Sequence, residues 1–288
     1  MLTDYHVHLR QDEPGTTAER HFTAANADAY KQAAAARGID ELGVSEHIHR
    51  FREALDVWQH PYWVESAHDD LDAYCEFLAR NDLRVGIEAD YIVGAEDRIA
   101  NLLEARPFDY VIGSVHFIGE GSVDQQRWDV WEIEGHDPDK VWRKYFERLA
   151  AAAESGLYDI LAHPDLVKVW GSGRATPEGD LRRYYEPAVE AMAASGVAVE
   201  ISTAGYRKQV GEIYPARPFA EMCIEAGLEF TISSDAHLPE HLGWNYEQAV
   251  AFMREVGIER ICAFEDRERR TEPLEDPLPA ADGEGPGR

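Results

Sequence analysis

Tyr5-His6-Val7-His8 is the first of seven short, mostly apolar runs in this chain of 288 residues, and each run ends on side chains that can hold a metal ion. Segments with helical periodicity separate the runs, and this alternation is typical of a parallel sheet. Seven such runs in order predict a parallel barrel with a polynuclear metal site at the carboxyl ends of its strands, where barrel enzymes keep their chemistry. The other runs are Ser45-Glu46-His47, Gly86-Ile87-Glu88-Ala89-Asp90, Ser114-Val115-His116, Leu161-Ala162-His163-Pro164-Asp165, Val199-Glu200-Ile201-Ser202 and Ser233-Ser234-Asp235-Ala236-His237.

Apolar residues recur at helical spacing between these runs. The clearest helix is expected over 138–154, because Asp137 can cap it, Pro138 suits its first position and Gly156 can end it. The other expected helices are 28–37, 66–81, 96–104, 181–195, 216–226 and 245–256.

Three longer loops, 9–22, 49–65 and 118–137, each follow a run that carries ligands. Loops of this length inside a compact domain are usually functional. Aromatic residues in the second and third loops can form walls of a substrate pocket or lids packed on the barrel rim, and they are Trp58, Tyr62, Trp63, Trp128 and Trp131.

Residues 1–266 are expected to form one domain, because no boundary interrupts the alternation. Its last strand, 260–264, is expected to close or cover the barrel. From Arg267 onward the chain is charged and rich in proline and glycine, so 267–288 are expected to be a disordered tail without a catalytic role.

Composition indicates a cytoplasmic protein. Hydrophobic residues make up 44% of the chain, enough for a sizeable core, but no apolar stretch approaches the roughly 20 residues of a membrane helix. The N-terminus has no basic and apolar leader pattern, so no signal peptide is expected. Three cysteines, Cys75, Cys223 and Cys262, stand far apart and are expected to be reduced and buried.

The net charge of −27 argues against nucleic acid or an anionic membrane as a partner. A small anionic substrate stays compatible with this charge, because bound metal ions would invert the local field. The sequence leaves open whether the chain is a monomer or a homodimer.

His6 and His8 stand two apart on an expected strand, so both side chains point to the same face. Taken alone, such a pair is common on surface strands, and each further polar residue at a strand end is more often a satisfied core or surface group. A buried carboxylate such as Glu88, however, is costly unless it is paired or binds a cation. The repetition at successive strand ends therefore predicts one shared metal site.

Imidazole and carboxylate ligands without thiolate suit zinc, manganese or iron rather than a structural zinc cluster. A bridging carboxylate would hold two ions within about 4 Å, the spacing of two-metal phosphoryl hydrolases. We therefore expect two or three divalent transition-metal ions.

These motifs resemble the PHP (polymerase and histidinol phosphatase) superfamily, and most of all its monofunctional histidinol-phosphate phosphatases. The resemblance covers the chain from Asp4 to about Phe264. The matching stretches include Asp4-Tyr5-His6-Val7-His8 and Gly113-Ser114-Val115-His116-Phe117, with 45–47, 86–91, 109–112, 162–168, 200–208, 210–215 and 233–237.

The resemblance implies an α/β fold, a distorted (β/α)7 TIM-like barrel with its active site at the carboxyl ends of the strands. It also implies a trinuclear site. The first metal would be held by His6, His8, Glu88 and Asp235, a second by Glu88, His116 and His163, and a third by His47 and His237.

The third metal of the family normally takes one more ligand from the loop after the first strand, often a histidine. Position 14, where that histidine is expected, is Pro14 in this chain. Asp12 is the preferred substitute, followed by Glu13 and His21. The first loop therefore differs from the family pattern.

Superfamily and ligand set both indicate hydrolysis of a small phosphomonoester. The metals would bind phosphate oxygens and lower the pKa of a bridging water, whose hydroxide would attack phosphorus. Glu88 counts as catalytic through its bridging position, and Asp235 or His237 could neutralise the leaving alkoxide. The most similar enzymes would convert L-histidinol phosphate to L-histidinol and phosphate, a step of histidine biosynthesis.

Arg207 follows the strand that ends near Glu200, and a guanidinium can grip phosphate through two parallel hydrogen bonds. Lys208 and Lys168 are further phosphate candidates. Glu200 either supports ligand histidines or contacts a substrate ammonium. The imidazole and amine of histidinol phosphate would suit acidic and aromatic loop residues, including Trp131, Glu132 and Trp170.

Two other functions stay open from the sequence. A PHP phosphoesterase acting on nucleotides or other small phosphate esters would use the same metals. A non-catalytic PHP module would belong to a larger assembly, but it would lack ligands that this chain retains.

Overall fold

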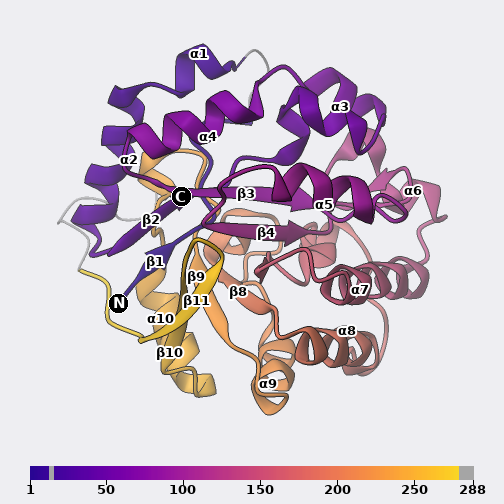
Figure 1. The fold of residues 1–288 in the computed structure, drawn as a ribbon. Coiled ribbons are helices and arrows are strands. Elements are labelled where there is room, and N and C mark those ends of the chain that lie inside the picture. Colours follow the sequence, from indigo (N-terminus) through magenta and orange to yellow (C-terminus); the bar gives the residue numbers. More distant parts are fainter. Residues whose placement is uncertain (13–15, 279–288) are drawn as a thin grey trace.

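The strand pairing defines the architecture of the computed structural model, which describes residues 1–12 and 16–278 (Figure 1). Seven strands lie in one sheet in the order β1-β2-β3-β4-β7-β8-β9, and every neighbouring pair is parallel. Past the two edge strands, Val7 bridges to Ala236 in parallel. The sheet is therefore a nearly closed barrel, and the predicted (β/α)7 fold is confirmed. The strands are β1 (Thr3–Asp4), β2 (Glu41–Val44), β3 (Arg84–Asp90), β4 (Tyr110–Ser114), β7 (Ile160–Leu161), β8 (Ala198–Ser202) and β9 (Phe230–Ser233).

Helices surround the barrel (Figure 1). The helix α7 (Pro138–Glu154) has the predicted bounds, and the Asp137 carboxylate accepts a hydrogen bond from the Lys140 N–H at 3.1 Å. The helix α8 (Arg182–Ser195) ends at Gly196, whose φ of 72° is left-handed. The remaining helices are α1 (Ala18–His21), α2 (Ala24–Ala36), α3 (Pro61–Ser66), α4 (Leu71–Arg80), α5 (Glu96–Glu104), α6 (Val130–Ile133), α9 (Arg217–Glu225) and α10 (Tyr246–Val256).

The long loops contain short structured pieces rather than open coil. Between β2 and α4 lie two turns of 3-10 helix, η1 (Ile48–Arg50) and η2 (Arg52–Asp56), followed by α3. Between β4 and α7 lie a small hairpin, β5 (Phe117–Ile118) with β6 (Gly121–Ser122), then η3 (Gln126–Trp128) and α6. The other 3-10 turns are η4 (Leu166–Lys168), η5 (Gly171–Gly173), η6 (Thr203–Arg207) and η7 (Pro239–His241).

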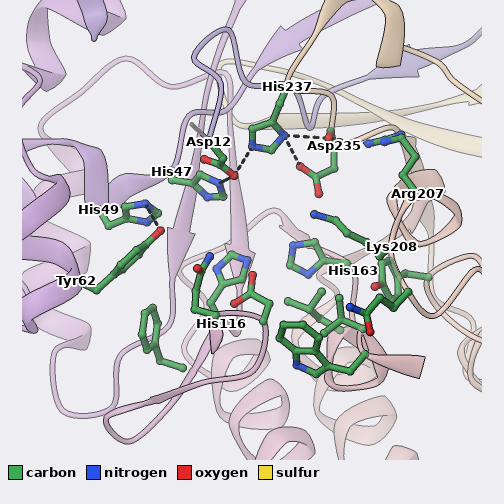
Figure 2. A pocket seen from close by; sticks show the side chains of 18 residues that line it. Asp12, His47, His49, Tyr62, His116, His163, Arg207, Lys208, Asp235 and His237 are labelled. Atoms are coloured by element: carbon green, nitrogen blue, oxygen red, sulfur yellow. Dashed lines mark hydrogen bonds and ion pairs between the residues drawn. The ribbon is translucent and has the colours of Figure 1, made fainter. Parts of the chain in front are cut away.

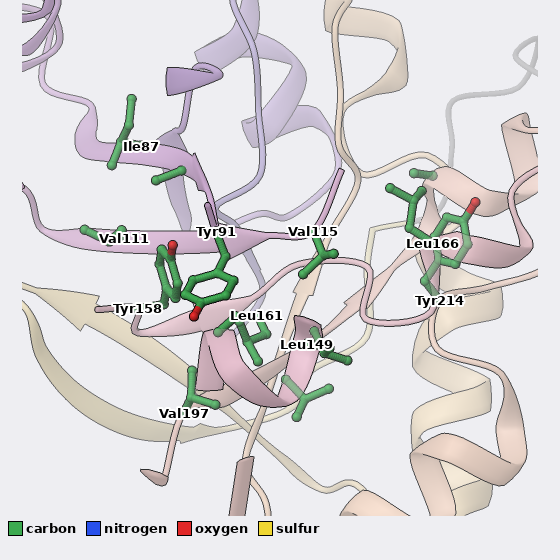
Figure 3. Close-up of a cluster of buried hydrophobic side chains, with 14 of the residues drawn as sticks. Ile87, Tyr91, Val111, Val115, Leu149, Tyr158, Leu161, Leu166, Val197 and Tyr214 are labelled. Carbon is green, nitrogen blue, oxygen red and sulfur yellow. The ribbon is translucent and has the colours of Figure 1, made fainter. Parts of the chain in front are cut away.

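Apolar side chains fill two regions. The larger one lies between strands and helices, and Figure 3 shows a part of it in which Leu161 lies near Leu149. The smaller cluster includes Tyr5 and Tyr110 at the barrel centre together with Phe264 from outside the barrel sheet. None of the helices among the described residues is long and apolar enough to cross a membrane. The three cysteines are free and buried, as predicted.

The expected strand near residue 260 covers the barrel instead of joining its sheet. This strand, β10 (Arg260–Glu265), pairs antiparallel with β11 (Glu268–Pro273). The Phe264 N–H donates to the Tyr5 hydroxyl at 3.2 Å, and the Arg267 N–H donates to the carbonyl of Asp109, just before β4. The hairpin therefore lies at the amino ends of the strands, opposite the predicted site.

The prediction of a disordered tail from residue 267 was wrong for 268–273, which form β11. Charged side chains order this strand because they meet acidic groups near the starts of barrel strands. Arg270 forms an ion pair with Glu41, and the Arg269 Nε lies 3.1 Å from Glu229. Residues 279–288 of the predicted tail lie outside the described part of the chain.

Candidate metal centre

Eight side chains from six strand ends converge at the carboxyl rim of the barrel. They form four overlapping groups of three, and within each group the candidate ligand atoms lie within 4.8 Å of one another. Because the groups share members, they make one continuous cluster. The groups are His8, His47 and His237; His6, His8 and Asp235; His6, Glu88 and His163; and His47, Glu88 and His116.

Glu88 lies at the middle of this cluster, because both of its carboxylate oxygens face imidazoles. Oε2 lies near the first two strand ends and Oε1 near the fourth and fifth. The distances are 3.4 Å from Oε2 to His6 Nε2, 3.7 Å to His8 Nε2 and 2.5 Å to His47 Nδ1, and from Oε1 3.5 Å to His116 Nε2 and 3.3 Å to His163 Nε2. A carboxylate with this arrangement can bridge two ions.

Many ligand atoms in the cluster make no hydrogen bond to the described residues, although some of them lie within ion-pair distance of one another. Buried polar atoms are normally hydrogen-bonded, so several unpaired atoms in one place require another partner. Divalent ions would satisfy imidazole nitrogens and carboxylate oxygens together, and the donor set fits them. The unpaired atoms are His6 Nε2, His8 Nδ1 and Nε2, His47 Nδ1, both oxygens of Glu88, His163 Nδ1, Asp235 Oδ1 and His237 Nε2.

Electrostatics keeps the two buried carboxylates ionised. Burial opposes the ionisation of Glu88, but His47 and His6 outweigh it and hold the pKa of Glu88 well below its usual range. The pKa of Asp235 is also well below its usual range, because His6 outweighs burial. Burial and the neighbouring His237 lower the pKa of His8 to about 4. At neutral pH the cluster therefore offers anionic oxygens and a neutral imidazole, the forms that bind cations.

Two buried carboxylates contact the Nδ1 atoms of two candidate ligand histidines, on the side of each ring away from Glu88. Glu200, fully buried, accepts from His6 Nδ1 at 2.9 Å and from the backbone N–H of His163 at 2.7 Å. Asp90 lies 2.8 Å from His116 Nδ1. Such partners orient ligand imidazoles and raise their basicity. Of the two roles considered for Glu200, its contacts with His6 and His163 favour the support of candidate ligand histidines.

Backbone strain coincides with the cluster. His163 has a φ of 25° and Asp235 a φ of 51°. Residues other than glycine rarely adopt a positive φ, and those that do are often found at functional sites. Both strained residues stand at strand ends that would contribute metal ligands.

Of the three candidates for the third site, Asp12 reaches the cluster. Its Oδ2 lies 3.0 Å from His237 Nε2 and 3.8 Å from His47 Nε2 (Figure 2). His21 ends α1 and belongs to none of the groups that could hold an ion. Glu13 lies outside the described residues.

A cavity of about 320 Å³ opens above the cluster. Arg207 and Lys208 line it on one side, whereas His49 and Tyr62 line it on the other (Figure 2). Asp12, His47, His116, His163, Asp235 and His237 face the same cavity. Six of the nine predicted ligands and two of the predicted phosphate-binding residues thus line one cavity.

Arg207 is held rigidly at this wall. Its Nη2 donates to the carbonyl oxygens of Ser234 at 2.6 Å and Asp235 at 2.9 Å, and its guanidinium lies 5.7 Å from the Trp244 ring centre. Its Nη1 has no partner within residues 1–12 and 16–278. Nη1 is therefore the buried part of the guanidinium that lacks a partner within the described residues.

Lys168 does not reach the cavity. Its Nζ pairs with Asp165 at 2.9 Å and Glu212 at 3.1 Å and donates to the carbonyl of Ile213 at 2.9 Å. These contacts satisfy the ammonium inside the loop that carries Tyr214. A direct contact between Lys168 and phosphate is therefore not supported.

The aromatic loop residues divide between pocket and core. Tyr62 and Trp170 line the cavity, as expected. Trp131 is 1% exposed and Trp63 is fully buried, so both pack in the core. Glu132 is at the surface, where His136 lies 3.1 Å away. The prediction that Trp131 and Glu132 contact the leaving group was wrong, because α6 turns Trp131 inward.

Several residues in or beside the cluster and its cavity were not predicted. Asp90 stands two positions after Glu88 on β3, and this spacing on one strand face could have revealed it. His49 stands two positions after His47, and its ring stacks at 4.8 Å on that ring. Asp124 and Gln125 line the cavity from an irregular segment without periodicity, so the sequence carried no signal for them.

Comparisons with known proteins agree with this geometry. The sequence model of the PHP domain matches residues 20–204. A probable histidinol-phosphatase of Deinococcus radiodurans is 33% identical over 280 residues, which cover 94% of this chain and 99% of the relative. A histidinol-phosphatase of Lactococcus lactis is 20% identical over 269 residues, covering 91% of this chain and 93% of the relative.

One solved structure shares the whole fold. The crystal structure of histidinol phosphate phosphatase from Lactococcus lactis, complexed with zinc, L-histidinol and phosphate, superposes with a TM-score of 0.71 at 18% identity. It covers 93% of this chain, and this chain covers 98% of it. At this identity the likeness establishes the fold.

Proposed function

This chain belongs to the PHP domain family, and from that premise we propose that it is a metal-dependent phosphatase that hydrolyses L-histidinol phosphate to L-histidinol and phosphate. The observation that carries the proposal is the cluster of ligand atoms without hydrogen bonds among the described residues, beside an arginine whose Nη1 also lacks a partner there. A relative with 33% identity over nearly its full length is a probable histidinol-phosphatase. These observations agree on phosphomonoester hydrolysis.

The proposed ligands are the eight clustered side chains and Asp12. Two or three divalent ions bound there would neutralise phosphate oxygens and lower the pKa of a water molecule toward neutrality. Zinc, manganese and iron all suit imidazole and carboxylate, and the similar Lactococcus lactis structure contains zinc. Among the ligands, Glu88 would be shared between two ions because each of its oxygens faces different imidazoles.

The residues around the ions would bind and orient the substrate. Arg207 would grip the phosphoryl group through Nη1, while Lys208 adds a second positive charge on the same wall. Glu200 and Asp90 would keep His6 and His116 in their ligand orientations. Asp235 and His237 lie beside the cavity and would be close to the leaving oxygen.

The leaving group would lie against Tyr62 and Asp124. One carboxylate oxygen of Asp124 accepts from the Ser122 hydroxyl at 2.7 Å, while the side chain lines the cavity. A carboxylate there suits the ammonium group of histidinol, and Tyr62 and Trp170 suit its imidazole ring. These residues take the role that the sequence suggested for Trp131 and Glu132.

A substrate panel tests this function. The zinc- or manganese-loaded protein should release phosphate from L-histidinol phosphate with a higher kcat/KM than from nucleoside monophosphates, a nucleoside 3′,5′-bisphosphate, sugar phosphates or glycerol phosphate. The physical reason is the pairing of an anionic Asp124 with a cationic leaving group.

The matched control is His116→Ala, which removes a ligand at the cavity and should abolish turnover while circular dichroism shows an intact fold. A higher kcat/KM for the nucleoside bisphosphate would assign the chain to a phosphoesterase of nucleotides. Undiminished activity of His116→Ala would remove the metal cluster from the mechanism.

A further inference from the structure

The carboxylate of Asp12 is held from two sides. Its Oδ2 faces the imidazoles of His237 and His47, at 3.0 and 3.8 Å. Its Oδ1 accepts from Nη2 of Arg50. Oδ2 therefore faces the candidate metal ligands, whereas Oδ1 contacts Arg50.

Arg50 is well placed to fix that orientation. It ends η1 and is 3% exposed. Its Nη1 donates to the backbone carbonyl of Arg10 at 2.8 Å and to the carboxylate of Glu46, while Nη2 reaches Asp12. The planar guanidinium therefore joins the first loop to the end of β2 in one fixed geometry.

Glu46 anchors the other side of this arrangement. It is fully buried, accepts from the Arg10 N–H at 2.9 Å, and its Oε2 lies 3.8 Å from His8 Nδ1. Because Arg50 pairs with both Glu46 and Asp12, a continuous polar chain connects His8 with Asp12. Arg50 also compensates two carboxylates that would otherwise repel each other beside the cluster.

Asp12 occupies a half-exposed loop, so it needs such support. Its side chain is 54% exposed, whereas His47 and His237 are 12% and 18% exposed. A loop side chain with this exposure is free to leave the cluster unless a rigid partner holds it. Arg50 is the partner that the described residues provide at its rear oxygen.

We propose that Arg50 is a positioning residue that presents Asp12 to a metal ion between His47 and His237, so that retention of this ion depends on Arg50. In this arrangement Asp12 would be the ligand from the first loop, and the buried Glu46–Arg50 pair would hold it in place. This inference rests on the proposed metal-dependent function, because it concerns an ion of the same cluster.

Zinc binding by three variants tests the proposal without an activity assay. The variants are Asp12→Ala, Arg50→Lys and the double variant. Arg50→Lys keeps the positive charge but loses the planar guanidinium that contacts Glu46 and Asp12 together. Zinc content is measured by elemental analysis after reconstitution, and the affinity of the weakest ion by competition with a chelating dye. Arg50→Lys and Asp12→Ala should each lower the affinity for one zinc ion by roughly 10- to 100-fold and leave the binding of the other ions unchanged.

The double variant should be no weaker than Asp12→Ala, because Arg50 acts through Asp12. The control is Arg106→Lys, which alters a mostly buried arginine whose Nε lies 2.8 Å from Asp72, on another part of the barrel. This control should retain every ion. Thermal melting of all variants verifies that each is folded at the assay temperature.

Three outcomes overturn the proposal in distinguishable ways. Full zinc affinity in Arg50→Lys together with a loss in Asp12→Ala would make Arg50 irrelevant to the ion. Full affinity in both would remove Asp12 from the ligand set. If the unaltered protein bound neither zinc, manganese nor iron, the proposed function itself would be overturned, and this inference with it.

Discussion

At the scale of single residues, Glu88 shows how burial and chemistry are connected. Its side chain is inaccessible to solvent, and both oxygens lack hydrogen-bond partners in the described part of the chain. An ionised carboxylate in that position would cost several kcal/mol without compensating charge. The surrounding imidazoles, above all His47 and His6, supply that charge in the metal-free protein and hold the pKa of Glu88 well below its usual range. Divalent ions would supply the charge once they replace the imidazole protons. Glu88 is therefore the carboxylate around which the candidate ligands gather.

Arg207 supports a prediction at the same scale. Arg207→Ala should raise KM for L-histidinol phosphate and lower kcat/KM by roughly 10- to 100-fold, because a charge-assisted hydrogen bond to phosphate is lost. The same change frees the carbonyl oxygens of Ser234 and Asp235, so kcat should fall as well. Steady-state kinetics would measure both constants.

Competitive inhibition by inorganic phosphate provides the control for Arg207. Inhibition should weaken in parallel with KM in Arg207→Ala and recover partly in Arg207→Lys, which keeps the charge. Unaltered KM and inhibition in Arg207→Ala would exclude this residue from the phosphate site.

At the scale of elements, the barrel strands depend on glycines that face aromatic rings. A Cβ at Gly86 on β3 would lie 2.2 Å from Cζ of Tyr110, and one at Gly43 on β2 would lie 2.3 Å from its hydroxyl. The Tyr110 hydroxyl donates to the carbonyl of Tyr5 at 2.6 Å, so the ring cannot move aside without losing that bond. Close strand packing here positions the ends that carry His47 and Glu88.

Gly86→Ala should therefore destabilise the fold by roughly 1 to 3 kcal/mol, the usual cost of overpacking a core. Chemical denaturation followed by circular dichroism would measure the change. Gly173→Ala is the matched control, since its added Cβ would meet the end of the flexible Gln209 side chain at 3.1 Å. Equal stability of the two variants would contradict the role of Tyr110.

Most helices and strands could be predicted from local sequence patterns such as caps, prolines and hydrophobic periodicity. The cap at Asp137 and the proline at position 138 determined the start of α7, and the alternation of strand and helix determined the barrel. The antiparallel strand β11 could not be predicted, because its residues are charged and carry no alternating pattern. Its order depends on acidic groups that the fold brings together from distant strands, such as Glu41 and Glu229.

For the whole molecule, the stability that bound ions add to the fold should depend on pH. In the metal-free protein burial lowers the pKa of the imidazoles, but Asp90 and Glu88 outweigh it and raise the pKa of His116 to about 10. Glu88 and Asp12 likewise raise the pKa of His47 to about 9. These histidines stabilise the metal-free fold most below the unfolded pKa of about 6.5, and this stabilisation is lost as the pH rises through 9 to 10.

Divalent ions bind deprotonated imidazole, so the stability that they add to the fold should increase as the pH rises. The difference in Tm between the ion-loaded and the chelator-treated protein should therefore widen as the pH rises from 6 to 9. Thermal melts in matched buffers with and without a chelator would measure this difference. A difference that narrows with rising pH would contradict the assignment of His47 and His116 as ligands.

The barrel and the rim at which its chemistry would lie could be predicted from the amino-acid sequence. Parallel strands joined by helices must all end at one rim, so polar residues at the strand ends are brought together whatever the details of packing. That is why His6, His8, His47, Glu88, His116, His163, Asp235 and His237 could be predicted and are found in one cluster.

Which loop residues join that cluster became clear from the three-dimensional structure. Loops lack periodicity, and their side chains are placed by contacts between residues far apart in the sequence. Arg50 turns Asp12 toward His237, whereas Asp165 and Glu212 draw Lys168 away from the cavity. Likewise, Glu200 became a support for His6 because β8 places it, fully buried, beside that ring.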